Sequence, residues 1–213
     1  MAHPHGLDRN ASGLVKAAAI GLLGACALAL AGAAPEPDPV PRRWQLELSP
    51  GPLRMVSLEV PGQGPRMYLY MTYSVVNNSG EDILFAPAFE MANGEGEILR
   101  SGREVPQVVT EQIVASTQNP FSEDQIAIIG TLLQGREHGK EGVVIWPVTD
   151  ANPERITIYA AGFSGETATV DSPRSSTRYV LRKTLRLDYD TPGDLVRQRL
   201  DPIPVRERTW IMR

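Results

Sequence analysis

Cysteine and histidine are nearly missing from this 213-residue chain. The single cysteine is Cys26, and two of the three histidines, His3 and His5, stand among the first five residues. Disulfides, thiolate catalysis and cysteine-ligated metals therefore have no residues to use after position 26. A Ser-His-Asp triad or a histidine-based zinc site would have to be built around His138 alone. We expect no metal and no cofactor.

An excess of basic charge is also missing. Residues 34–213 hold 19 basic and 24 acidic side chains, a net charge of −5. This balance disfavours nucleic-acid binding by the chain as a whole. From Asp171 onward, however, ten Lys or Arg stand against six Asp or Glu. The sequence therefore predicts an acidic body with a basic C-terminal third.

One long apolar run is present, over residues 17–34, and it contains no charged side chain. Basic residues precede it, and Ala31-Gly32-Ala33 ends it with the small-x-small pattern that signal peptidases accept. The pattern predicts a signal peptide over residues 1–33, with cleavage between Ala33 and Ala34.

Two alternatives stay open for this leader. Leu23-Gly24-Ala25 before Cys26 resembles a lipobox, which would make Cys26 a lipidation site. A retained anchor is the other alternative, because 18 apolar residues reach the lower limit for crossing a hydrocarbon core of about 30 Å. In each case the basic flank stays inside. We expect an exported chain, periplasmic or extracellular, that meets a membrane only through its N-terminal segment.

Alternating prolines over residues 34–42 predict a stiff, extended linker. The remaining residues, 43–213, are enough for one domain with a core of its own. Within them, period-two alternation predicts strands, and helical spacing of valine and isoleucine predicts one helix over residues 104–117. The strands are expected over residues 44–48, 53–60, 67–77, 83–85, 89–91, 98–99, 143–148, 155–160, 178–189 and 209–212.

Turn-forming residues predict how these strands connect. Ser49-Pro50-Gly51-Pro52 predicts a break between the first two strands. Asn78-Ser79-Gly80 predicts a hairpin from residues 67–77 to residues 83–85. Asn93-Gly94 predicts a second hairpin with a type I′ turn. Residues 126–133 fit either a strand or a buried helical turn.

Many short strands and one helix predict a mainly β fold, an antiparallel β-sandwich with a peripheral helix. The segments YLYMTYSVVNNSGEDI, AFEMANGEGEI and KEGVVIWPVTDANPERITIY resemble immunoglobulin-like domains of exported bacterial proteins of unknown function. The resemblance covers about residues 53–161 and implies an immunoglobulin-like sandwich. It implies no catalytic residue, because the shared positions belong to turns and core.

Three short motifs resemble catalytic or metal-binding sites, but each lacks some of the features that such a site requires. Residues 188–194 hold three aspartates in a partial calcium-loop pattern, but Pro192 and Arg199 occupy ligand positions, which favours a turn. His138 could act as a general base, yet it stands in a charged, glycine-bounded segment that we interpret as a hairpin tip. Ser164 lacks the glycine spacing of a nucleophile elbow and is interpreted as a turn residue.

Arginines of the last third offer a surface for an anionic partner, with Arg178, Arg182 and Arg186 on one strand. The competing interpretation is a solvated face whose arginines pair with acidic neighbours. Our leading hypothesis is a non-catalytic binding or structural domain at the cell envelope, with an envelope protein or polymer as partner. The alternative is a carboxylate-based hydrolase or a cation-dependent carbohydrate-acting module that uses residues such as Glu90, Asp188 or Asp190.

Overall fold

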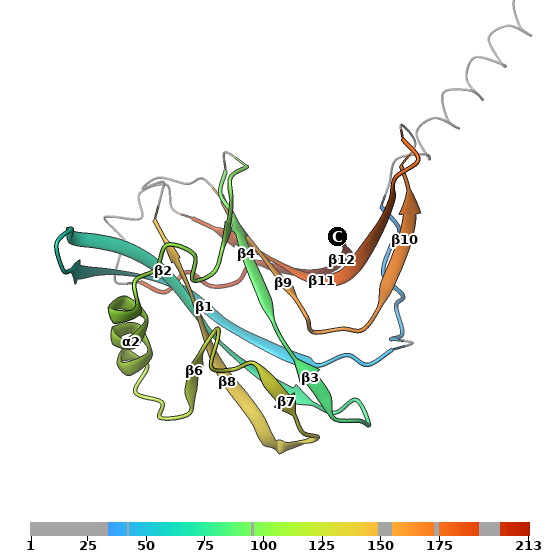
Figure 1. Cartoon of the computed structure of the whole chain (residues 1–213), viewed down its shortest axis with the longest axis horizontal. Coiled ribbons are helices and arrows are strands. Elements are labelled where there is room, and N and C mark those ends of the chain that lie inside the picture. Colours follow the sequence, from blue (N-terminus) through green and yellow to red (C-terminus); the bar gives the residue numbers. More distant parts are fainter. Residues whose placement is uncertain (1–33, 42, 95, 149–154, 173–174, 192–200) are drawn as a thin grey trace, which may run out of the picture.

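The computed structural model describes residues 34–41, 43–94, 96–148, 155–172, 175–191 and 201–213. The leader prediction, with Cys26 and Ala33, lies outside these residues. Within the described ranges no helix is long and apolar enough to cross a membrane. The elements of the chain (Figure 1) are β1 (Glu47–Val60), β2 (Gly64–Asn77), β3 (Ile83–Phe85), β4 (Ala88–Ala92), β5 (Ile98–Arg100), α2 (Gln107–Ser116), β6 (Ser122–Asp124), β7 (Gly130–Leu132), β8 (Gly135–Pro147), β9 (Arg155–Ala161), β10 (Thr167–Asp171), β11 (Arg178–Asp190) and β12 (Glu207–Met212).

The strands form two main sheets and a small one. The first sheet has the order β1-β2-β8-β6, and its pairs are antiparallel except for β6 with β8. The second sheet has the order β10-β11-β9-β4-β5, with β12 on the other edge of β11, and all its pairs are antiparallel. The small sheet pairs β3 with β7. The prediction of a mainly β, antiparallel-rich chain with one helix is confirmed.

β2 is central in the first sheet because both of its faces are apolar. Its Leu69, Met71 and Tyr73 join the main core, which also takes side chains from β4, β9 and β11 of the second sheet. Tyr68 and Tyr70, on the other face, join a second core under α2. β2 is thus a central strand of its sheet, and its tyrosines are used in packing on both faces.

The predicted helix is also confirmed, and it covers the outer face of the first sheet (Figure 1). Val109 and Ile113, one turn apart, are buried against Val143 and Ile145 of β8. Pro106 precedes the first turn, where its missing amide hydrogen costs no intrahelical hydrogen bond. The first sheet is therefore packed on both faces.

The predicted break at Ser49-Pro50-Gly51-Pro52 is wrong, since β1 is one strand with a bulge between Pro50 and Leu53. Bulges accept proline because one residue there leaves the hydrogen-bonded ladder. Gly51 fits the bulge because a β-carbon would lie 2.8 Å from Thr72 Oγ1 and 2.9 Å from the Thr72 carbonyl oxygen.

The predicted hairpin at Asn78-Ser79-Gly80 is wrong as well. β3 pairs with β7 and makes no ladder with β2. The side-chain amide of Asn77, which is fully buried, donates to the carbonyl oxygens of Glu81 (2.8 Å) and Leu132 (2.9 Å). The turn residues thus reverse the chain, but this amide directs it to β7, which lies in the undecided segment 126–133.

The second predicted hairpin is confirmed, because β4 pairs with β5. Its turn is not of type I′, which requires positive φ at both central residues. Gly96, with φ of 83°, is the left-handed residue of this loop, and its amide donates to the Asn93 carbonyl oxygen at 3.1 Å. Glycine two positions after Gly94 therefore closes the turn.

Candidate functional site

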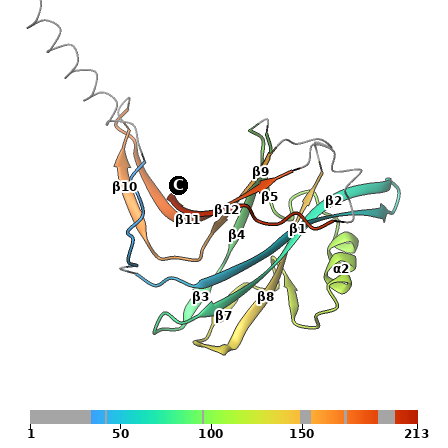
Figure 2. The same ribbon diagram turned by 180° about the vertical axis from the view of Figure 1, so that it is seen from behind.

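The outer side of the second sheet carries a set of charged and polar side chains from β4, β9, β11 and the C-terminal segment. Along β11 the odd-numbered Leu185, Leu187 and Tyr189 enter the main core, so the even-numbered residues point to the opposite side. Figures 1 and 2 show that the sheet bends along β11 and is hollow on that opposite side. We call this side the concave face.

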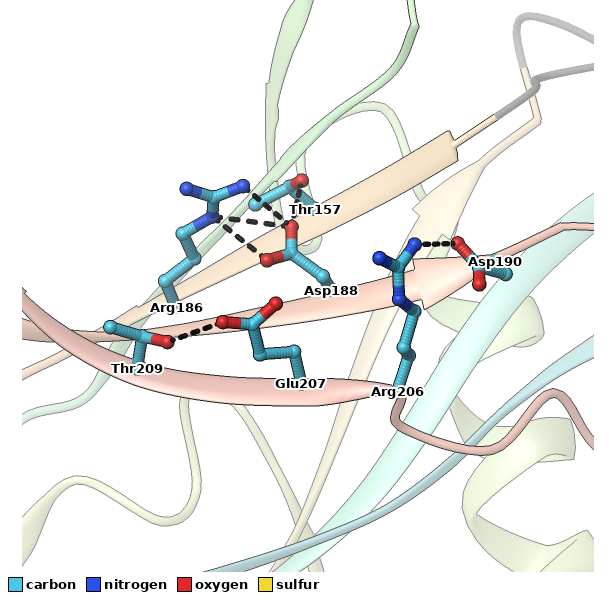
Figure 3. Close-up of polar contacts among 7 residues, drawn as sticks. All are labelled: Thr157, Arg186, Asp188, Asp190, Arg206, Glu207 and Thr209. Carbon is cyan, nitrogen blue, oxygen red and sulfur yellow. Dashed lines mark hydrogen bonds and ion pairs between the residues drawn. The ribbon is translucent and has the colours of Figure 1, made fainter.

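Asp188 is the most buried charged group of the concave face, with 7% of its surface exposed. Thr157, its neighbour across the β9–β11 ladder, donates a hydroxyl hydrogen bond of 2.6 Å to the Asp188 carboxylate. Arg186 donates from Nε and Nη2 to the same carboxylate at 3.2 and 3.1 Å (Figure 3). The carboxylate is thus fully partnered, as a buried charge must be.

A second ion pair joins β11 to the start of β12. Arg206 Nη1 lies 2.7 Å from Asp190 Oδ1 (Figure 3), and both side chains are more than half exposed. The hydrogen bond with Asp190 and its negative charge raise the pKa of Arg206 above the ordinary value. This pair is solvated, so its contribution to stability is small.

A third pair lies across β4 and β9. The Arg213 guanidinium stands 4.2 Å above the centre of the Tyr159 ring and forms an ion pair with Glu90. Tyr159 is the direct neighbour of Glu90 on one side and of Arg186 on the other. The concave face therefore presents a row of carboxylate, ring and guanidinium groups that are held by regular strands.

The arginines change what the candidate carboxylates can do. Glu90, Asp188 and Asp190 each form an ion pair with an arginine. Each of these candidate carboxylates is therefore already engaged with a cation of its own chain. Among the described residues, no group of three or more His, Cys, Asp or Glu could hold a metal ion.

The three predicted arginines lie four residues apart on β11, on its even-numbered side. Arg178 pairs with its cross-strand neighbour Asp171 at 2.9 Å, and Arg186 pairs with Asp188. Arg182 is exposed, and no acidic side chain of the described ranges pairs with it. The three arginines thus share one side of the strand, and two of them have acidic neighbours as partners, as the second interpretation expects. Arg174, Arg197 and Arg199 lie outside the described residues.

The interpretation of His138 as part of a hairpin tip is wrong. It lies inside β8, a 13-residue strand whose first half is charged and exposed. Its side chain is 45% exposed, and its Nε2 lies 3.9 Å from Glu137 Oε1. Ser164 has a local role, because its hydroxyl accepts a hydrogen bond from the Glu166 amide at 3.2 Å. Asp194, in the partial calcium pattern, is outside the described residues.

A buried ion pair at the other side of β11 escaped prediction, although Lys183 stands at an apolar position of the strand. Lys183, 3% exposed, donates from Nζ to Glu166 Oε2 at 2.8 Å and to the carbonyl oxygen of Asp38 at 3.1 Å. The Asp38 amide donates to Glu166 Oε1 at 2.8 Å. We call these three residues the linker clasp, because they fix the proline-rich linker to the domain. A charged residue on an apolar face was the available signal.

A groove of about 760 Å³ lies near the start of α2. Arg66, Tyr68 and Glu104 contribute polar groups to its lining. Glu104 has a φ of 62°, a left-handed conformation that is unusual for a residue other than glycine. Burial raises the pKa of Tyr68 above its ordinary value. The groove is thus a second surface feature. The residues that line it are distant in sequence from the arginines of β11.

Comparisons with known proteins assign no family to this chain. No family model, curated protein or solved structure matches it. The residues and contacts of the concave face are therefore the basis for the function proposed below.

Proposed function

We propose that the chain is an exported, non-catalytic binding domain of the cell envelope, with an immunoglobulin-like β-sandwich fold, and that the concave face is its ligand-binding surface. The observation that carries the proposal is the arrangement of arginines on this face. Arg186 uses Nε and Nη2 on Asp188, which leaves its Nη1 hydrogens for a ligand. Asp188 and Thr157 thereby hold the guanidinium in one orientation before the ligand arrives.

The spacing of the arginines indicates the kind of ligand. Residues four apart in a strand are separated by about 13 Å, so Arg178, Arg182 and Arg186 stand along β11 at regular intervals of that size. A small anion can touch only one of them. An extended polymer or a protein surface that repeats carboxylate or phosphate groups can touch several at once, and guanidinium groups suit both kinds of anion.

Exposure supports the same surface. The side chains of Arg186 and Arg213 are 39% and 36% exposed although both are paired, so their free hydrogens are open to a ligand. Tyr159 beside them is half-buried and offers a ring edge. Regular strands hold these groups, and strands place side chains more reproducibly than loops do.

Binding of defined polymers tests the proposal. The full chain is titrated with polygalacturonate for carboxylates, polyphosphate for phosphates and dextran as a neutral polymer. We expect binding to at least one polyanion and none to dextran, with an affinity that falls as salt is raised. Arg182→Ala combined with Arg186→Ala should weaken binding tenfold or more.

The matched control is Arg103→Ala, which removes an exposed arginine that pairs with Glu104 away from β11. It should leave binding unchanged. Equal binding by the double variant and the original chain would overturn the proposal, as would equal affinity for dextran and the polyanions.

A further inference from the structure

β12 is an edge strand of the second sheet. Among the described strands it pairs only with β11 (Figure 2). Arg182 and Arg213 exchange both backbone hydrogen bonds, at 2.7 and 3.1 Å. In an antiparallel ladder such pairs alternate with pairs that share no bond. The amides and carbonyls of Arg208, Trp210 and Met212 therefore point away from β11.

These outward groups make no backbone hydrogen bond to any part of the chain that the structure describes. Edge strands are usually protected from pairing with another chain by proline, lysine, a bulge or a very short length. β12 has six residues, ERTWIM, with neither proline nor lysine. By contrast β5, at another border, has three. β12 is thus an edge strand that is long enough, and free enough of these protecting features, to accept a further strand.

We infer that the outer edge of β12 pairs with β12 of a second copy of this chain, antiparallel and with the two-fold axis at Trp210. In this register Arg208 lies opposite Met212 of the second copy, and Trp210 lies opposite itself. Every outward amide and carbonyl of the three residues gains a partner. The pairing is isologous, so it closes after two copies.

Charge favours a second copy over an unrelated extended peptide. The same register places Glu207 opposite Arg213 of the second copy, and Arg213 opposite its Glu207. Both residues lie on the concave side, where Thr209 supports Glu207 with a hydrogen bond of 3.2 Å (Figure 3). On pairing, Arg213 would turn from Glu90 and Tyr159 of its own chain to Glu207 of the second copy. If the axis moved to Thr209, Glu207 would face Ile211, and both charge pairs would be lost.

The dimer would extend the binding surface. The two second sheets would become one continuous sheet, and both concave faces would lie on its same side. A polymer that contacts Arg182 and Arg186 of one copy could then continue onto the other. The pairing itself depends on β12 and is independent of any ligand.

A charge-swap experiment tests the pairing. Sedimentation of the full chain in mild detergent should show a dimer at micromolar concentration. Glu207→Arg and Arg213→Glu should each shift the chain toward monomer, by tenfold or more in dissociation constant, because like charges then face each other. An equimolar mixture should restore dimers, since each variant complements the other. Circular dichroism checks that both variants are folded.

A cross-link tests the register. Residues that exchange both bonds across an antiparallel pair have Cα atoms about 5.5 Å apart, within disulfide range. In a Cys26→Ser background, Trp210→Cys should therefore form a covalent dimer on oxidation, whereas Phe121→Cys, exposed on the loop before β6, should not. A chain that stays monomeric, or a mixture of charge variants that does not reassociate, overturns the inference.

Discussion

The two sheets differ in what lies on their outer faces. α2 covers the first sheet with Val109 and Ile113, which are 0% and 1% exposed. On the second sheet the same position in the fold holds Arg186, Asp188 and Tyr159, and their ion pairs reach solvent. One sheet therefore uses its outer face for packing, while the other keeps it polar. The outer face of the second sheet, which has no apolar cover, is the face that we propose binds a ligand.

The largest effect is expected at the linker clasp, where a charge pair lies inside the protein and not on the concave face. Lys183→Ala removes one cationic partner of Glu166, whose side chain is only 13% exposed. We expect the free energy of unfolding to fall by about 3–5 kcal/mol. Urea denaturation measures it. In the control, Lys183→Met with Glu166→Met should recover most of the loss, and a loss below 1 kcal/mol in the single variant would contradict the buried pair.

The next largest loss of stability is expected from a change in α2, the helix that covers the first sheet. Ile113→Ala removes a fully buried side chain from the core under α2 and leaves a cavity. We expect a loss of about 3 kcal/mol, measured by urea denaturation, because large-to-small changes in cores cost 2–5 kcal/mol. Binding of polyanions by the folded fraction should not change. Weakened binding would show that the two outer faces are not independent.

The concave face should be less sensitive in stability and more sensitive in binding. Asp188→Ala removes the acceptor of Thr157 and Arg186. Hydrogen bonds to charged groups contribute about 1.5–3 kcal/mol, so we expect a loss near 2 kcal/mol. Since Arg186 also loses its orientation, affinity for the polyanion should fall severalfold in titration calorimetry. Unchanged affinity would mean that Asp188 has only a structural role.

High pH distinguishes the buried core from the solvated face. Burial raises the pKa of Tyr73 and of Tyr189 well above the ordinary value of 10.0. Their stabilising contribution is complete below pH 10. It decreases as pH rises further, because the unfolded chain then releases protons that the folded chain retains. We expect thermal stability to fall above pH 10, by up to about 1.4 kcal/mol per pH unit for each tyrosine.

Phenylalanine variants separate the two tyrosines. The Tyr73 hydroxyl is buried without a hydrogen-bond partner among the described residues, whereas Tyr189 donates to Met71 Sδ at 3.0 Å. Tyr73→Phe should therefore leave stability at pH 7 unchanged or higher and reduce the loss above pH 10. An unaltered pH profile in both Tyr73→Phe and Tyr189→Phe would contradict the assignment.

The smallest effect is expected at His138, which is exposed on β8. This strand belongs to the first sheet, whereas the concave face belongs to the second. His138→Ala should change the unfolding free energy by less than about 0.5 kcal/mol, as is usual for surface positions. It should also leave polymer binding unchanged across pH 6 to 8, measured by titration. A pH-dependent loss of binding would place His138 in the ligand surface after all.

The sequence was sufficient to predict those elements whose local residue pattern shows which side chains are buried. The two apolar faces of residues 67–77 and the helical spacing of Val109 and Ile113 were sufficient for β2 and α2. The first half of β8 could not be predicted, because Arg136, Glu137 and His138 resemble a loop. In the structure they belong to β8 but lie at an irregularity of its ladder with β2, between the pairs Asn77–Gly135 and Val75–Lys140. The partner of β3 was equally hidden, since it depends on a long-range hydrogen bond from Asn77.

The concave face was predicted in part. The sequence placed Arg178, Arg182 and Arg186 on one strand, but it could not show that Thr157 lies beside Asp188. Nor could it bring Arg213 over Tyr159, because these residues meet only when β4, β9, β11 and β12 assemble. Pairing between distant strands is decided by the whole core, and local patterns do not carry it.

The linker clasp has a mechanical consequence. Tension that arrives along the linker reaches Asp38 before it reaches β1, and the Asp38 bonds to Glu166 and Lys183 resist it first. Behind them, the bonds between Leu46 and Phe163 and between Trp44 and Gly165 would be strained next. A pulling force from the direction of a membrane would thus break this short series of bonds first, and the arginines of β11 would stay in place.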